Sequence, residues 1–266
     1  MAHPSLARVD HRPWPLPSKR WVWRQTWTDL LFAHWPIPVA ALREFVPDGL
    51  TIRQKDGIGW IGVVPFRMGG TRRPFPFVPF LSSFPEVNVR TYVEKDGKPG
   101  VWFLSLDADS LFTVWFARRY FHLPYHKAIM NISHYDGWTR LGSERRSGSG
   151  TVRFNCRYRP ISDPREAEPG SLDSFLAENY RLYSADPAGR LHSIDVHHAP
   201  WPLQRAEAEL EAATFRELLA EEKLDSIKGL LKSVGGLIDE TDKELAPSPA
   251  VVPESTPTEP TPAYIT

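Results

Sequence analysis

The sequence predicts one α+β domain made mostly of antiparallel strands, with two or three helices inserted between them. The chain contains short segments rich in β-branched and aromatic residues. Within them apolar and polar residues alternate, as they do in half-buried strands. Asp-Gly turn signals at 56–57, 96–97 and 136–137 divide these segments into hairpins. A few other stretches show apolar residues at helical spacing.

Composition limits the class of protein. With 266 residues, 41% of them hydrophobic, the chain has ample material for a sizeable core. Lys and Arg total 32, as do Asp and Glu, and this balance argues against a nucleic-acid-binding groove, which shows a cationic excess. Cys156 is the only cysteine, so no intramolecular disulfide can form, which fits a reducing compartment.

The sequence shows no targeting or membrane-spanning segment. The N-terminal region lacks an apolar run of signal-peptide length. No uncharged stretch approaches the roughly 20 residues of a spanning helix. We therefore expect a soluble cytoplasmic protein without a membrane partner.

The first third of the chain predicts an arm followed by strands. Residues 1–19 are rich in proline and lack periodicity, so we expect an extended N-terminal arm. Residues 21–35 mix aromatic and polar residues as a strand does, and 38–45 predict a short helix that begins at a proline. A hairpin is expected over 51–68, and a proline-rich loop over 69–79.

The middle of the chain predicts a hairpin that leads into a helix. The β-branched content of 86–93 indicates a strand, and 101–106 is the return strand after a Lys-Asp-Gly turn. Apolar residues over 109–121 follow helical spacing, with Asp109 or Ser110 as the N-cap.

The last part of the domain returns to strands. Three strands are expected over 128–158, a helix over 172–182 and strand structure over 191–210. Ser171 is placed to cap the helix. The body of the domain then spans 20–213.

Two segments follow the domain. Residues 214–240 carry apolar residues at helical spacing and predict an amphipathic C-terminal helix. Such a helix either packs on the body or lies exposed; a partner-binding or membrane-surface role is the alternative, and its mixed charge does not favour a membrane. Residues 241–266 are rich in Pro, Ser, Thr, Glu and Ala, which predicts a disordered tail.

One segment carries a family resemblance. Residues 84–131 read as strand, turn, strand and helix, followed by a loop dense in functional groups. The stretch Ala117–His126 aligns without gaps with the pattern Gly-Arg-Glu-x-x-Gly-Phe-Pro-Lys-Lys of the acetoacetate decarboxylase superfamily. The chain resembles that superfamily, in particular its YqjF-like branch, whose members are largely uncharacterised. The resemblance covers about 21–210 and implies a twisted antiparallel sheet that closes into a cone or barrel around a pocket.

The same alignment bears on the chemistry. Arg118 and Pro124 match the pattern, whereas Tyr125 and His126 stand where the decarboxylase has its two lysines. In that enzyme one lysine forms a Schiff base, and the resemblance implies that this chain lacks the pair. Lys127 is displaced by about 3–7 Å along an extended backbone, which disfavours the same reaction. His126 is a candidate acid or base and Tyr125 a candidate proton donor, unless both are structural.

A strand before this loop carries three polar residues on one face. Because strand side chains alternate, Glu86, Asn88 and Arg90 share a face, and Val87 and Val89 share the other. An ordinary half-buried surface strand shows this pattern too. The resemblance favours a polar stripe lining a pocket, since the decarboxylase has a glutamate at the position that matches Glu86.

Two further charged positions allow more than one interpretation. Asp107 and Asp109 could bind a hard metal or act as acid and base, although an aspartate there is also a natural helix cap. Arg118 could clamp a carboxylate with two hydrogen bonds, or simply face the negative end of the helix dipole. His197 and His198 point in opposite directions on a strand and make a poor metal site.

The resulting hypothesis is a small-molecule pocket protein that acts on a carbonyl or carboxylate compound by acid/base chemistry. No nucleotide, metal or redox motif is present, so no cofactor is implied. A non-catalytic ligand-binding or scaffold module, and a decarboxylase or aldol-type lyase using Lys127, are the alternatives. Association into a homo-oligomer is left open. The candidate catalytic residues are His126, Tyr125, Glu86 and Lys127, and the candidate binding residues are Arg118, Asn88, Arg90 and Asp107.

Overall fold

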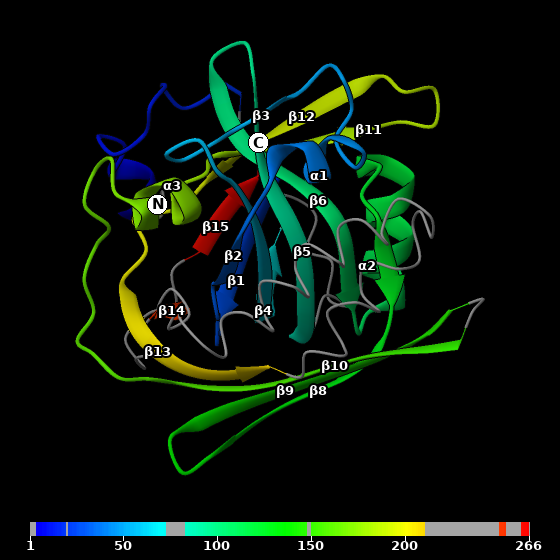
Figure 1. The fold of residues 1–266 in the computed structure, drawn as a ribbon, viewed down its shortest axis with the longest axis vertical. Helices are drawn as coiled ribbons and strands as arrows, with labels where there is room; N and C mark the ends of the chain where they lie inside the picture. Colours follow the sequence, from blue (N-terminus) through cyan, green and yellow to red (C-terminus); the bar gives the residue numbers. More distant parts are fainter. Residues whose placement is uncertain are drawn as a thin grey trace.

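The computed structural model contains two sheets that face each other across a shared core (Figure 1). It describes residues 4–19, 21–72, 83–147, 150–210, 250–253 and 262–265. Within this part of the chain, no helix is long and apolar enough to span a bilayer.

The larger sheet curls around an interior. Its strands are β1 (Trp23–Thr28), β2 (Ala33–Ile37), β3 (Thr51–Ile52), β4 (Gly59–Arg72), β5 (Phe84–Lys95), β6 (Lys98–Ala108), β7 (Tyr125–Lys127), β11 (Arg181–Ala185), β12 (Leu191–His197) and β15 (Pro262–Ile265). Their order is β2-β4-β1-β15-β12-β11-β6-β5-β3, and β4 also pairs with β5. This extra pairing returns the order to its start, so the sheet closes on itself.

The long strand β4 makes this closure possible. One of its edges pairs with β2 in its first half and with β1 in its second half. Its other edge pairs with β5 over eight residues, from Ile61 to Met68. A single strand therefore joins three others, which bends the sheet rather than extending it.

The smaller sheet crosses one face of the curled sheet as a set of long, curved ribbons (Figure 1). Its strands are β8 (Ile129–Tyr135), β9 (Trp138–Ser147), β10 (Gly150–Pro160), β13 (Leu203–Leu210) and β14 (Ala250–Pro253). Their order is β14-β13-β10-β9-β8. The three strands expected over 128–158 are confirmed as β8, β9 and β10.

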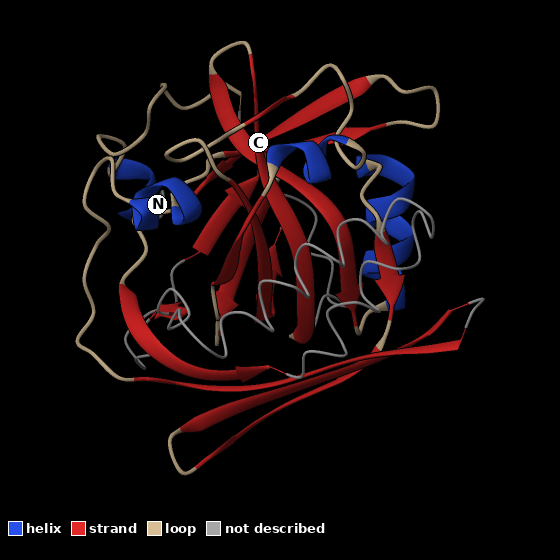
Figure 2. Cartoon of the chain, in the orientation of Figure 1, coloured by secondary structure: helices blue, strands red, loops and turns tan. Residues whose placement is uncertain are grey.

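Short helices lie at the margins of the sheets (Figure 2). They are a 3-10 turn η1 (Pro4–Ala7), α1 (Val39–Arg43), α2 (Leu111–Phe116), a π-helical turn η2 (Ala117–Phe121) that continues α2, and α3 (Leu172–Ala177). Ser110 Oγ accepts from the Thr113 backbone N–H and so caps α2, and Ser171 caps α3 in the same way. Of the two expected caps for α2, Ser110 rather than Asp109 is the one used.

The curled sheet is buried on both faces. On β5, Val87 and Val89 point into the core shared with the smaller sheet. Leu106 on β6 points into a second core inside the curled sheet, with Phe66 and Trp201. The alternating side chains of β5 therefore point into two different interiors. In an ordinary half-buried strand, one of the two faces would meet solvent.

A buried ion pair joins the two sheets. The Arg145 guanidinium on β9 lies 2.6 Å from the Asp107 carboxylate on β6, and both side chains are 1% exposed. Arg145 also donates to Ser105 Oγ, and Ser143 Oγ donates to the other Asp107 oxygen. Because both charges are removed from water, loss of either side chain would leave the other as a buried charge without a counter-ion.

Several expected boundaries differ. Residues 21–35 form two strands, because Asp29 at φ 54° turns the chain between β1 and β2. The helix expected over 172–182 ends at Ala177, since Arg181–Ala185 pairs as β11 with its neighbours β6 and β12. Residues 191–210 likewise form two strands, β12 and β13.

The C-terminal segments fall partly outside the described residues. The amphipathic helix expected over 214–240 lies outside them. Within 241–266, where a disordered tail was expected, Ala250–Pro253 pairs with β13, and Pro262–Ile265 bridges β1 and β12. These strands rest on backbone pairing, for which the composition of the segment gives no signal.

Breaking the ion pair between the sheets tests this arrangement. We expect Arg145→Met to lower the free energy of unfolding by about 3–5 kcal/mol, because Asp107 is left buried without its counter-ion. Denaturant unfolding followed by circular dichroism measures the change. As a control, Arg153→Met on β10 breaks an ion pair with Glu144 on β9, and these two side chains are 60% and 47% exposed. This control should cost less than about 1 kcal/mol; equal losses for the two variants would contradict the assigned role of Arg145.

Candidate functional site

The interior of the curled sheet contains a cavity of about 130 Å³ that opens in part to solvent. Glu86, Asn88 and Arg90 line it from β5, and Tyr125 lines it from β7. Because β7 runs parallel to β6 with Tyr125 beside Leu106, the phenol points to the same side as the cavity-facing Leu106. Four of the eight predicted site residues therefore meet in one cavity.

Glu86 and Tyr125 form a buried acid pair. The Tyr125 hydroxyl donates to Glu86 Oε2 at 2.9 Å, and both side chains are buried. Burial raises the pKa of Glu86 to about 8; the hydrogen bond from Tyr125 opposes this rise and the charge of Asp107 adds to it. Burial, together with the Glu86 charge, also raises the pKa of Tyr125 well above its usual value. At neutral pH both groups hold their protons.

Asn88 and Arg90 present polar atoms that lack partners. Asn88 is 5% exposed, and its Oδ1 and the Nε of Arg90 are buried without a hydrogen bond among the described residues. Arg90 donates to the Leu176 carbonyl oxygen at 3.3 Å, and its guanidinium lies over the rings of Phe32 and Tyr92. Buried polar atoms are rarely left unpaired, so these two mark a place where a ligand can bond.

The rest of the wall combines aromatic rings with aliphatic side chains. Trp27 and Trp201 stack with their planes 9° apart, and Phe66 meets Trp27 edge-on. Phe116 and Phe121, from the α2–η2 segment, meet each other edge-on with ring centroids 5.5 Å apart. Rings braced in this way keep their orientation, so the wall has a fixed shape.

Further polar lining residues, among them Arg181, Asn179 and His198, were not singled out as site residues from the sequence. Arg181 forms two hydrogen bonds with Asp195, and the Asn179 side chain bonds Arg53 and backbone carbonyls. His198 is 2% exposed, and burial lowers its pKa to about 4. Their sequence neighbourhoods carry no motif. Asn179 lies in the loop after α3, Arg181 on β11 and His198 directly after β12, all far from β5 in the sequence.

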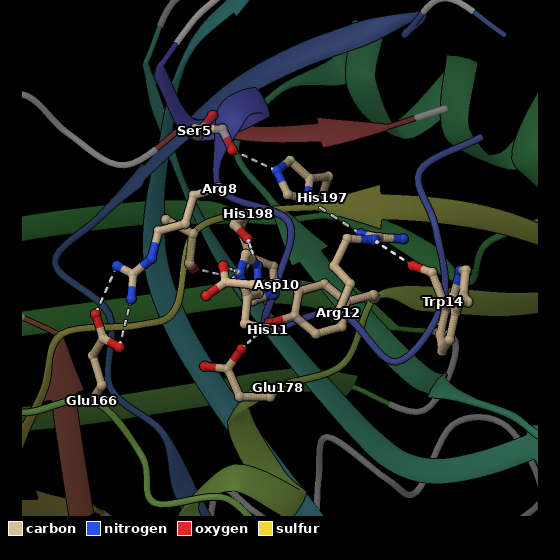
Figure 3. Close-up of polar contacts among 12 residues, drawn as sticks. Ser5, Arg8, Asp10, His11, Arg12, Trp14, Glu166, Glu178, His197 and His198 are labelled. Carbon is tan, nitrogen blue, oxygen red and sulfur yellow. Dashed lines mark hydrogen bonds and ion pairs between the residues drawn. The ribbon is translucent and has the colours of Figure 1, made fainter. Parts of the chain in front are cut away.

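The N-terminal arm packs against His198, one of the residues that line the cavity (Figure 3). His11 Nε2 bonds the His198 carbonyl oxygen at 2.9 Å, and Arg12 donates to the Val196 carbonyl oxygen at 2.7 Å. The Tyr180 ring stacks on His198 and lies 5.4 Å from His11. The arm therefore contacts a residue that lines the cavity, and it is held to the body of the domain by hydrogen bonds and ring contacts.

Arg118 and Asp107 lie away from the cavity. Arg118 is exposed and donates to the Tyr125 carbonyl oxygen at 3.4 Å. Asp107 belongs to the ion pair with Arg145, on the face of β6 that meets the smaller sheet. The structure therefore places neither residue where it could contact a ligand in the cavity.

His126 and Lys127 also lie outside the set of described residues that line the cavity. His126 follows Tyr125 on β7 and lies beside Asp107 in the register, so it points to the opposite face. The Lys127 ammonium is paired with Asp109 and donates to the Ala128 carbonyl oxygen, with 35% of its side chain exposed. Across the described ranges, no cluster of three or more His, Cys, Asp or Glu side chains is arranged to hold a metal ion.

Comparisons with known proteins agree with this architecture. The profile of the family DUF2071, described as "Uncharacterized conserved protein", matches residues 24–233. The uncharacterized protein YqjF of Bacillus subtilis is 45% identical over 211 residues, which is 79% of this chain and 86% of that protein.

Solved structures with similar folds are acetoacetate decarboxylase-like. Acetoacetate decarboxylase from Legionella pneumophila superposes with a TM-score of 0.52 at 11% identity, over 96% of this chain and 88% of that one. The enduracididine biosynthesis enzyme MppR, in complex with pyruvate, superposes with a TM-score of 0.51 at 11% identity, over 92% and 85% of the two chains. At this identity the likeness shows the fold alone, and it confirms the expected acetoacetate decarboxylase-like architecture.

The buried state of Glu86 makes stability depend on pH. Because its pKa is higher in the folded chain, at about 8, than in the unfolded chain, the folded chain binds more protons between about pH 4.5 and 8. Stability contributed by neutral Glu86 is complete below this window and is lost as pH rises through it. Relative to Glu86→Gln, we expect the wild-type unfolding free energy to fall by about 1.4 kcal/mol per pH unit there.

Denaturant unfolding at a series of pH values measures this slope. A Tyr125→Phe variant removes the hydrogen bond that lowers the Glu86 pKa, so it should move the upper end of the window above pH 8. Parallel curves for the wild type and Glu86→Gln would show that Glu86 is ionised inside the folded chain.

Proposed function

The chain belongs to the DUF2071 family of uncharacterized conserved proteins, and from that premise we propose that it binds a small carboxylate or carbonyl compound inside the curled sheet. The family description gives no activity, so support comes from the cavity. Besides the polar groups of β5 and Tyr125, the described lining consists largely of aromatic and aliphatic side chains. Small-molecule sites typically combine an apolar wall with a few converging polar groups.

The guanidinium of Arg90 is the observation that carries the proposal. It lines the cavity, its Nε has no hydrogen-bond partner, and no described carboxylate is ion-paired with it. A half-buried cation without a counter-ion is still costly, and an anionic ligand lowers that cost. The neighbouring Asn88 side chain supplies a further hydrogen-bonding group for the same ligand.

The Tyr125–Glu86 pair supplies the acid/base chemistry. With the pKa of Glu86 raised to about 8, the carboxyl is protonated at neutral pH, and the phenol that bonds it faces the same cavity. A carbonyl oxygen placed there can accept a hydrogen bond or a proton from the pair as charge develops on it. In this proposal Tyr125 and Glu86 act as the acid/base groups. His126, the third candidate from the sequence, does not take part.

The position of Lys127 supports chemistry without a Schiff base. A Schiff base needs an uncharged amine within reach of the substrate carbonyl. Lys127 is instead paired with Asp109 and is absent from the described residues that line the cavity. A non-catalytic binding module is favoured over the acid/base enzyme only if a bound ligand is released unchanged.

Binding of a 2-oxo acid tests the proposal. Pyruvate is the probe, because a protein of similar fold binds it. We expect calorimetric titration to show saturable binding, weakened about 10- to 100-fold in Arg90→Gln, since a hydrogen-bonded charge partner is lost. Arg118→Gln, which changes an exposed arginine outside the cavity, should bind as the wild type does. Wild-type binding that survives in Arg90→Gln would contradict the proposal.

Borohydride reduction tests the lysine alternative. With pyruvate present, we expect no covalent adduct on the intact chain by mass spectrometry, because the ammonium of Lys127 is held by Asp109. An adduct that disappears in Lys127→Met would revive the lyase alternative. Consumption of the bound ligand that is abolished in both Tyr125→Phe and Glu86→Gln, with the fold retained, distinguishes an enzyme from a binding module.

A further inference from the structure

The composition of the cavity wall narrows the ligand class. Building on the function proposed above, we propose that the cavity selects a monocarboxylate whose body is one aromatic ring or an apolar group of that size. The inference rests on three features of the cavity: one available cation, an aromatic wall of fixed shape, and a volume that fits a single ring.

The number of available cations limits the ligand to one carboxylate. Among the residues that the structure describes, two arginines line the cavity, but Arg181 already shares two hydrogen bonds with Asp195, at 2.8 and 2.9 Å. Arg90 is left as the cation that a ligand can neutralise. A second carboxylate would meet the aromatic wall or the Glu86 carboxyl, and burying it without a counter-ion is unfavourable.

The remaining polar lining groups are already bonded. Gln25 Oε1 accepts from the Trp27 indole, and the Asn179 amide donates to two backbone carbonyl oxygens. His198 Nδ1 bonds the Ala199 carbonyl oxygen. Away from β5 and Tyr125, the cavity therefore offers contact area more than hydrogen bonds, which suits an apolar body.

The aromatic wall has a preferred orientation for a ring. Trp27 and Trp201 lie nearly parallel with centroids 5.8 Å apart, and Phe32 meets Trp201 at 76° with centroids 5.7 Å apart. Phe116 at the end of α2 meets Trp23 of β1 at 76°. Aromatic rings attract one another in offset or edge-on arrangements at 4.5–7 Å, so a ligand ring can extend this cluster.

The volume of the cavity limits the size of the apolar part of the ligand. The cavity holds about 130 Å³. A dry protein cavity of about 150 Å³ lined by Leu, Ile and Phe side chains binds benzene. This cavity, which opens in part to solvent, is therefore of the right size for one six-membered ring beside its polar groups, whereas a methyl group leaves most of it empty and forgoes the contacts of the wall.

A matched pair of 2-oxo acids separates this inference from the proposed function. Phenylpyruvate and pyruvate share the same head group and differ by the ring. Titration calorimetry on the full chain at pH 7 should show phenylpyruvate binding at least about tenfold more tightly, because the ring buries apolar surface. The neutral ring compound 2-phenylethanol should bind at least about tenfold more weakly than phenylpyruvate, because it does not pair with Arg90.

Filling the cavity provides the structural control. Ala177 is 7% exposed and lines the cavity, and Ala177→Leu occupies part of the space meant for the ring. We expect this variant to lose the preference for phenylpyruvate while it still binds pyruvate. Leu182→Phe, at another lining position, serves if the first variant does not fold, as judged by its circular dichroism spectrum.

The outcomes separate cleanly. Equal affinity for the two acids, or equal weakening of both by Ala177→Leu, overturns the aromatic selectivity and leaves carboxylate binding in place. Absence of binding by either acid overturns the proposed function, and the selectivity with it. Tight binding of 2-phenylethanol, equal to that of phenylpyruvate, shows an apolar site in which Arg90 plays no part, and overturns the monocarboxylate class.

Discussion

Burial of β5 and β6 on both faces is the constraint on which the rest of the molecule depends. Successive side chains of β5 must satisfy two interiors, so Val87 and Val89 pack against the smaller sheet while Glu86 and Asn88 enter the cavity. A shift of one residue in pairing would exchange the two sets and bury three polar side chains in an apolar core. The Arg145–Asp107 pair, which crosses between the sheets, opposes such a shift because its geometry fits one register only.

The sequence predicts the architecture and half of the candidate site. Period-two alternation and Asp-Gly turns are local signals, so the β5–β6 hairpin and the shared face of Glu86, Asn88 and Arg90 are readable without a structure. The loop after α2 is different. Whether Tyr125 or His126 faces inward depends on the parallel pairing of β7 with β6, and spacing along the chain does not reveal that pairing.

The other lining residues come from segments that are distant in the sequence. This distance is why the sequence does not identify them as site residues. Asn179 and His198 come from the loops after α3 and after β12, and Arg181 comes from β11, which joins the sheet by long-range pairing. The N-terminal arm looks like a solvated, proline-rich segment, yet Arg12 is 8% exposed and bonds the backbone of β12. Such contacts have no periodic signature, because a single side chain makes each one.

The raised pKa of Glu86 couples the occupancy of the cavity to protons. A carboxylate bound beside this carboxyl repels its ionised form, so the occupied site holds the Glu86 proton more firmly than the empty site does. Above pH 8 the empty site has released that proton, and an arriving anion must bring one with it. Affinity for an anion then falls about tenfold per pH unit in that range, and each binding event becomes the uptake of a neutral acid.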